Sequence, residues 1–144
     1  MSRRRKPSIR NAPPTTGKQP RVEGLPDPSG QHPVWSFSIV DVGGPWCFSC
    51  LPGKDLPGVL TRLGQLEGMT WTEIEQGTGS HFVPCSRLVA EARRRLQNLH
   101  HDDLDELFSL RIKSKPRIWG IRIGPVLRVL WWDPDHQVCE STRG

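Results

Sequence analysis

Alternation of apolar and polar residues is clearest in the C-terminal part of the chain. Apolar side chains occupy every second position in segments 107–112 and 117–123, which is typical of β-strands. Segment 126–132 is almost continuously apolar, as expected of a strand covered on both faces. Because only short turns separate the three segments, they are predicted to form an antiparallel meander.

The N-terminal half contains one more strand signal. Trp35, Phe37 and Ile39 alternate with smaller or polar residues, which predicts a strand over 34–40. The Gly43-Gly44-Pro45 turn follows, and 46–48 is expected to return as a hairpin partner.

Apolar residues at helical spacing occupy the middle of the chain. A first helix is expected after Asp55, and a short second helix after Thr70, where Thr70 and Glu73 match a capping box. A third is expected after Ser86, and a further helical turn at Asp102 and Asp103. The expected apolar faces of the first and third helices are Leu56, Val59, Leu60, Leu63 and Leu66, and Leu88, Val89, Ala92, Leu96 and Leu99.

These elements predict an α+β fold of order β-α-α-α-β-β-β, with helices packed on a mainly antiparallel sheet. Residues 33–144 are expected to form a single domain. Residues 1–32 contain six prolines and few large apolar residues, so they are predicted to be a disordered basic tail.

The net charge of +5 comes entirely from that tail, which has seven basic and two acidic residues. The rest of the chain is neutral, with 13 basic and 13 acidic residues, but one region is strongly basic. Between positions 111 and 128 there are six cations and no carboxylate: Arg111, Lys113, Lys115, Arg117, Arg122 and Arg128. Such a cluster can attract phosphate locally.

The four cysteines raise the question of a metal site. Cys47 and Cys50 have the spacing of a zinc or redox pair, which His81 with Cys85, or His136 with Cys139, could complete. Small buried thiols are the preferred interpretation, so no metal or cofactor is predicted. No signal peptide or membrane span is recognised, which favours a cytoplasmic protein with free thiols.

Two motifs carry a resemblance. Arg117–Arg122 reads Arg-Ile-Trp-Gly-Ile-Arg, and residues 130–136 read Leu-Trp-Trp-Asp-Pro-Asp-His. Together they resemble a set of uncharacterised bacterial and phage proteins, a resemblance that brings no established activity.

A weaker resemblance is to the RelE/ParE toxin superfamily. Segments 107–111, 117–122 and 124–128 occupy the places of that family's Leu-x-x-Leu-Arg, basic-strand and Gly-turn-Arg elements. The resemblance implies ribosome-linked mRNA cleavage, or gyrase inhibition, and an antitoxin partner. Many of these toxins use a C-terminal Tyr, whereas this chain has no Tyr, so His136 would take that role.

RNA cleavage through the 2′-hydroxyl needs an acid, a base and cations that stabilise the phosphorane. His136, Arg122 and Arg128 are the predicted catalytic residues, and the arginines of the three C-terminal strands are expected to converge on one sheet face. The predicted substrate-binding residues are His81, Arg111, Lys113, Lys115 and Arg117. Strand arginines can also be solvated residues that protect sheet edges. Trp119, Trp131 and Trp132 are expected mainly in the core, and any exposed one would stack on bases.

The predicted function is therefore a RelE-like, toxin-type protein acting on RNA, as a metal-independent endoribonuclease or by binding RNA at the ribosome. One alternative is a non-enzymatic phage or mobile-element accessory protein that binds a protein partner. A further alternative is a nucleic-acid-binding module without catalysis.

Overall fold

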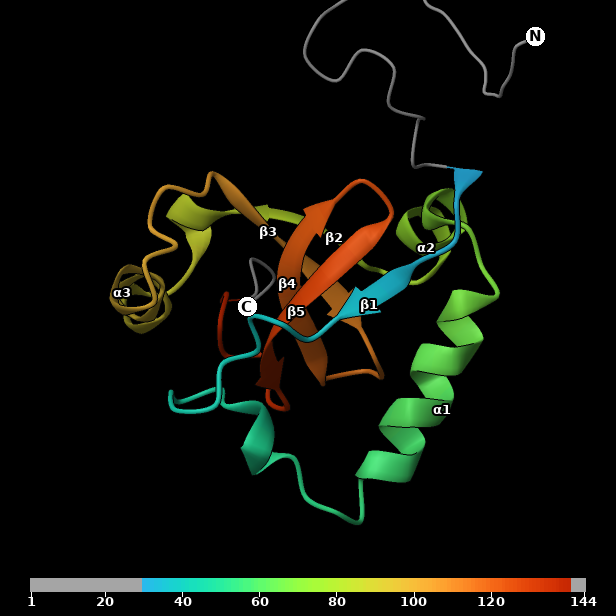
Figure 1. The fold of residues 1–144 in the computed structure, drawn as a ribbon, viewed down its shortest axis with the longest axis horizontal. Coiled ribbons are helices and arrows are strands. Elements are labelled where there is room, and N and C mark those ends of the chain that lie inside the picture. The colour runs from blue at the N-terminus through green and yellow to red at the C-terminus, as the bar shows by residue number, and fades with distance from the viewer. Residues whose placement is uncertain (1–29, 141–144) are drawn as a thin grey trace, which may run out of the picture.

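Residues 30–140, the part of the chain that the computed structural model describes, form a five-stranded sheet with helices on both faces (Figure 1). The predicted α+β class is confirmed. The elements in chain order are β1 (Val34–Ser36), the 3-10 turn η3 (Phe48–Cys50), α1 (Leu56–Glu67), α2 (Trp71–Gly77), β2 (His81–Pro84), the 3-10 turn η4 (Cys85–Arg87), α3 (Ala90–Asn98), β3 (Glu106–Arg111), β4 (Arg117–Ile123) and β5 (Val126–Asp133).

The strand order is β1-β5-β4-β3-β2. The predicted meander is confirmed, because β3, β4 and β5 pair antiparallel in sequence order. The sheet as a whole is mixed, since β1 runs parallel to β5 with Val34 opposite Val126. The first and last strands therefore lie side by side, as Figure 1 shows.

Several local predictions are wrong. The strand β2 was not expected, because it is short and ends at Pro84, yet it pairs antiparallel with β3 at the sheet edge. Residues 46–48 form no hairpin strand, and the chain instead makes the η3 turn. Asp102 and Asp103 lie in a turn rather than a helix.

The three helices occur where predicted, with two corrections at their faces and ends. In α1 the buried residues are Val59, Leu63 and Leu66, whereas Leu56 and Leu60 are exposed. The helix α3 begins after Val89, so Ser86 does not cap it.

The capping box of α2 is confirmed. The Thr70 hydroxyl accepts from the Glu73 backbone N–H at 3.2 Å, and the Glu73 carboxylate accepts from the Thr70 N–H at 2.9 Å. Two otherwise unpaired N–H groups of the helix start are thereby satisfied.

The sheet separates two apolar cores. One lies under α1 and α2 and includes Trp71, Phe108 and Trp132, and the other lies under α3 and includes Trp119 and Trp131. Trp131 and Trp132 point to opposite faces, as strand alternation predicts. Trp119, Trp131 and Trp132 are all buried, so none is free to stack on a base.

Two buried aspartates hold indole groups on the α3 side. Asp41 accepts hydrogen bonds from Trp131 Nε1 at 2.9 Å and from Arg95 Nε at 2.8 Å. Asp133 accepts from Trp119 Nε1 at 3.1 Å. The polar tips of these core tryptophans are therefore satisfied, as burial requires.

Of the predicted tail, 1–32, residues 1–29 lie outside the described part of the chain, and residues 30–32 lie within it. Gln31 and His32 already contact the helices: the Trp71 N–H donates to the Gln31 carbonyl at 3.0 Å, and His32 Nδ1 lies 2.9 Å from the Glu67 carbonyl oxygen. Contacts with the fold thus begin before the predicted boundary at 33. Among residues 30–140, no helix has the length and apolar character required to cross a bilayer.

Candidate anion-binding surface

The five predicted substrate-binding residues meet at one end of the sheet. Arg111 ends β3 and lies directly opposite Arg117 at the start of β4, and the loop between them carries Lys113 and Lys115. His81 begins β2, where it pairs with Ser109 of β3. These five residues, His81, Arg111, Lys113, Lys115 and Arg117, are called the basic end below.

Arg117 organises the loop that joins β3 to β4. Its Nη1 lies 3.0–3.2 Å from the carbonyl oxygens of the four residues 113–116. Arg111 adds a hydrogen bond from Nε to the Lys113 carbonyl at 3.0 Å. Because Arg117 is only 9% exposed, it shapes the loop rather than offering a free guanidinium to a ligand.

The charges of the basic end are poorly neutralised. Burial lowers the pKa of Arg117, the nearby charge of Arg111 lowers it further, and Asp133 opposes both effects. Within residues 30–140, no carboxylate oxygen lies within 4.0 Å of a charged nitrogen of Arg111, Lys113 or Lys115. Lys113 and Lys115 are thus exposed residues without an ion-pair partner in this part of the chain.

The glycine-rich segment 77–80 contacts both the side chain and the backbone of Arg111. Gly79 has a φ of +85°, and a Cβ at this position would lie 3.1 Å from Arg111 Nη1. The Ser80 hydroxyl accepts from the Arg111 backbone N–H at 2.9 Å. His81 Nδ1 lies 3.1 Å from the Gly79 carbonyl oxygen, so the exposed imidazole is held beside Arg111.

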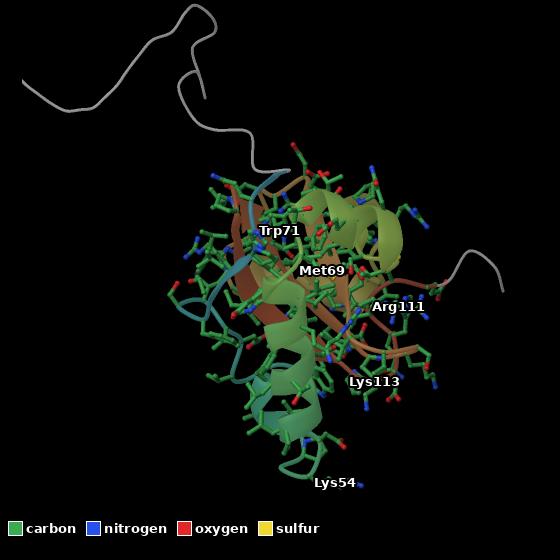
Figure 2. All side chains as sticks on the ribbon, turned by 90° about the vertical axis from the view of Figure 1, so that its right-hand side faces the viewer. Lys54, Met69, Trp71, Arg111 and Lys113 are labelled. Carbon is green, nitrogen blue, oxygen red and sulfur yellow. The ribbon has the colours of Figure 1, made fainter. Side chains whose placement is uncertain are left out.

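One further cation lies at the start of α1, on the side of the molecule that carries Lys113. A hollow of about 150 Å³ separates the first turn of α1 from the loop, and Lys113, Asp55 and Trp132 are among its lining residues. Figure 2 shows Arg111, Lys113 and Lys54 following one another along this side of the molecule. Lys54 was missed from the sequence, because nothing in its local pattern places it on the side that carries Lys113.

The predicted catalytic residues do not gather there. The Arg122 side chain is 7% exposed and pairs with Glu75 at 2.6 Å. Its guanidinium carbon lies 4.0 Å from the ring centroid of Trp71, on the α1 and α2 face. The adjacent residues Leu110 and Ile118 belong to that core, so Arg111 and Arg117 point to the opposite face. The prediction that the arginines share one face is therefore wrong for Arg122.

Arg128 and His136 differ in their distance from the basic end. Arg128 Nη2 lies 3.5 Å from Ser38 Oγ, beside β1. It precedes Asp133 by five residues, about 16 Å along the strand. His136 is half-buried in the turn after β5, with a φ of +58°. Because Asp133 pairs with Arg117, His136 lies at the same end of the sheet as the basic end.

The cysteines do not assemble a metal centre in the described part of the chain. Between residues 30 and 140, no group of three or more Cys, His, Asp or Glu side chains is placed to hold a metal ion. Neither the His81 and Cys85 pair nor the His136 and Cys139 pair therefore completes a site with Cys47 and Cys50.

Comparisons with protein-family models, with curated proteins and with solved structures find no match for this chain. Its function must therefore be argued from the geometry of the basic end. The ammonium groups on the fixed loop, with the half-buried Arg111 beside them, are suited to phosphate oxygens, which they bind by charge-assisted hydrogen bonds.

Proposed function

We propose that the protein binds the phosphodiester backbone of RNA through the basic end of its sheet. The observation that carries the proposal is the way the loop 113–116 is held. Arg111 and Arg117 bind its carbonyl oxygens, and Lys113 and Lys115 are left exposed and unpaired by carboxylates within residues 30–140. A loop already fixed loses less conformational entropy when a ligand binds.

The proposal is limited to binding because the catalytic groups are dispersed. Arg122 is covered by aromatic rings and Arg128 lies beside β1, so neither can stabilise a phosphorane at the basic end. Of the three predicted catalytic residues, only His136 lies at that end. RelE-like cleavage and an antitoxin partner stay predictions, and the same resemblance is what favours RNA over DNA.

The test is a salt titration of binding to a short, labelled, single-stranded RNA, followed by fluorescence anisotropy. The full chain is compared with a Lys113→Ala/Lys115→Ala variant. Binding by the variant should be weaker and less sensitive to salt. The negative slope of log association constant against log salt concentration should become shallower by about 1.4, or about 0.7 for each phosphate that the variant no longer neutralises. The matched control is Arg87→Ala/Arg94→Ala, which removes two exposed cations near α3.

The basic residues of the N-terminal segment 1–32 are present in both variants, so their contribution cancels in this comparison. An equal loss of affinity in both variants, or no loss in either, would rule out the basic end as the binding surface. The same RNA is examined on a gel after incubation. Cleavage that His136→Ala abolishes would replace the binding proposal with the endoribonuclease prediction.

A further inference from the structure

Cys47 and Cys50 are held within disulfide reach by the η3 turn, which the proposed RNA binding does not use. The backbone N–H of Cys50 donates to the Cys47 carbonyl at 3.0 Å. A turn of this kind keeps its first and fourth Cα atoms within about 7 Å of each other. The Cα separation of disulfides is about 4.4–6.8 Å, so the two thiols can join without rebuilding the backbone.

The two thiols differ in exposure and in chemical character. Cys50 is exposed, whereas Cys47 is 4% exposed. Ser49 Oγ lies 2.5 Å from Cys47 Sγ. This hydrogen bond, with weaker ones from the Ser49 backbone and from Cys50, lowers the pKa of the Cys47 thiol, although burial and the charge of Asp41 oppose it. A stabilised thiolate is both the attacking form of a cysteine and a good leaving group.

The turn is fixed to the sheet on both sides of Cys47. Trp46 packs on Trp131 with ring centroids 5.3 Å apart, and its carbonyl accepts from the Trp132 N–H at 3.0 Å. Phe48 packs on Trp132 at 6.2 Å. Because both neighbours of Cys47 are anchored, its thiol is held near Cys50. This placement favours reaction of Cys47 with Cys50 over reaction of Cys47 with a second molecule from solution.

We propose that Cys47 and Cys50 form a thiol–disulfide exchange site that reacts with small-molecule disulfides such as oxidised glutathione. The exposed Cys50 thiolate attacks the glutathione disulfide, which forms a Cys50–glutathione bond and releases one glutathione thiolate. The Cys47 thiolate then attacks Cys50 Sγ and expels the second glutathione. Two protein thiols are oxidised to one disulfide, and one glutathione disulfide is reduced to two thiols, with the two protons lost by Cys47 and Cys50 taken up by the two released glutathione thiolates.

The remaining cysteines provide internal controls. Burial raises the pKa of the Cys85 thiol, and the charges of Asp105 and Glu106 raise it further. Cys139 is 6% exposed, and its thiol donates to the Arg87 carbonyl at 3.5 Å. Both are therefore expected to react much more slowly with the disulfide than the Cys47–Cys50 pair does.

The test treats the reduced full chain with oxidised glutathione, blocks the remaining thiols by alkylation, and maps the modified peptides by mass spectrometry. We expect an intramolecular Cys47–Cys50 disulfide without retained glutathione, and alkylated Cys85 and Cys139. The Cys85→Ser/Cys139→Ser variant should form the same disulfide at the same rate.

Single variants separate the two steps. Cys47→Ser should accumulate glutathione on Cys50, whereas Cys50→Ser should acquire glutathione at Cys47 at least about tenfold more slowly. Glutathione that stays on Cys50 of the wild-type chain would overturn the proposal. A disulfide that involves Cys85 or Cys139 would also overturn it, and both results are read from the unmutated protein.

Discussion

The two hairpins of the C-terminal meander each carry two arginines at the same spacing, but only the first hairpin places both on one face of the sheet. Arg111 and Arg117 flank the β3–β4 loop, and Arg122 and Arg128 flank the β4–β5 turn, and the two members of each pair are six residues apart. In the first hairpin the two arginines are directly paired. In the second, Arg122 pairs with Leu127 and Arg128 with Ile121, so the two guanidinium groups leave opposite faces.

Loop length explains the difference. The first hairpin closes with a hydrogen bond from Ile112 N–H to the Pro116 carbonyl, which leaves three residues in the loop. The second closes at the Ile123 and Val126 pair, which leaves only Gly124 and Pro125. Changing a hairpin loop by one residue moves a side chain to the other face of its strand. Loop length thus directs one arginine pair to a common face of the sheet and sends the members of the other pair to opposite faces, where Arg122 is buried.

The most disruptive test of this comparison is at Gly120, where the β4–β5 register shifts by one residue. A methyl group there would clash with the Arg128 carbonyl oxygen and lie 2.9 Å from Leu127 Cδ1. We expect Gly120→Ala to lower the free energy of unfolding by about 3 kcal/mol or more, the upper end of overpacking costs. Urea unfolding measures this loss.

The control for that variant is Gly64→Ala in α1, where a Cβ would meet no atom within 4 Å. This substitution should raise stability by about 0.5–1 kcal/mol, because alanine is the better helix former. If Gly120→Ala were as well tolerated as Gly64→Ala, the register shift would not be a fixed feature of the second hairpin.

The next test compares the two arginines of the second hairpin. Arg122→Ala removes a guanidinium that stacks on Trp71 and pairs with Glu75, and it leaves a void among aromatic rings. The expected loss is about 2–3 kcal/mol, below that of a fully buried pair because Glu75 is partly exposed. Arg128→Ala should cost less than about 1 kcal/mol. Both losses are measured by denaturant unfolding. Equal losses of unfolding free energy in the two variants would contradict the predicted difference between a buried Arg122 and a peripheral Arg128.

Lowering the pH should affect Arg95 and Arg117 differently, because their hydrogen-bond partners differ. The partner of Arg95 is the Asp41 carboxylate, whereas those of Arg117 are carbonyl groups that do not titrate. Burial alone would raise the pKa of Asp41, but hydrogen bonds from Arg95, Gly43 and Trp131 outweigh it and lower the pKa from 3.8 to about 2.

A carboxyl group with a lowered pKa in the folded protein contributes stability above its unfolded pKa and loses it as the pH falls through the folded value. Between about pH 5 and pH 2, wild type should therefore lose about 2 kcal/mol that Asp41→Asn cannot lose. Urea unfolding of both proteins across this range gives the difference. A difference that is independent of pH would contradict the assigned role of Asp41.

At the first hairpin the expected loss of stability is smaller than for Gly120→Ala or Arg122→Ala. Arg117→Ala removes the hydrogen bonds to the loop carbonyls, but water can replace them, so the expected cost is about 1–2 kcal/mol. Hydrogen exchange of the loop amides should become faster, and RNA binding should weaken although Lys113 and Lys115 remain. Unchanged exchange in residues 113–116 would show that Arg117 does not hold the loop.

The sequence by itself determined the features that depend on neighbouring residues. The meander, the capping box of Thr70 and Glu73, and the opposite directions of Trp131 and Trp132 follow from strand alternation and from contacts within one helical turn. The clustering of Arg111, Lys113, Lys115 and Arg117 was also predictable, because one short loop joins their strands.

Only the tertiary structure decided which distant segments meet. It placed β1 parallel to β5, added β2 at the edge, turned Arg122 onto Trp71 and brought Lys54 to the side that carries Lys113. These outcomes depend on hairpin register and on packing between residues far apart in the chain. Local periodicity does not encode them, because it shows that a side chain alternates but not which partner it will face.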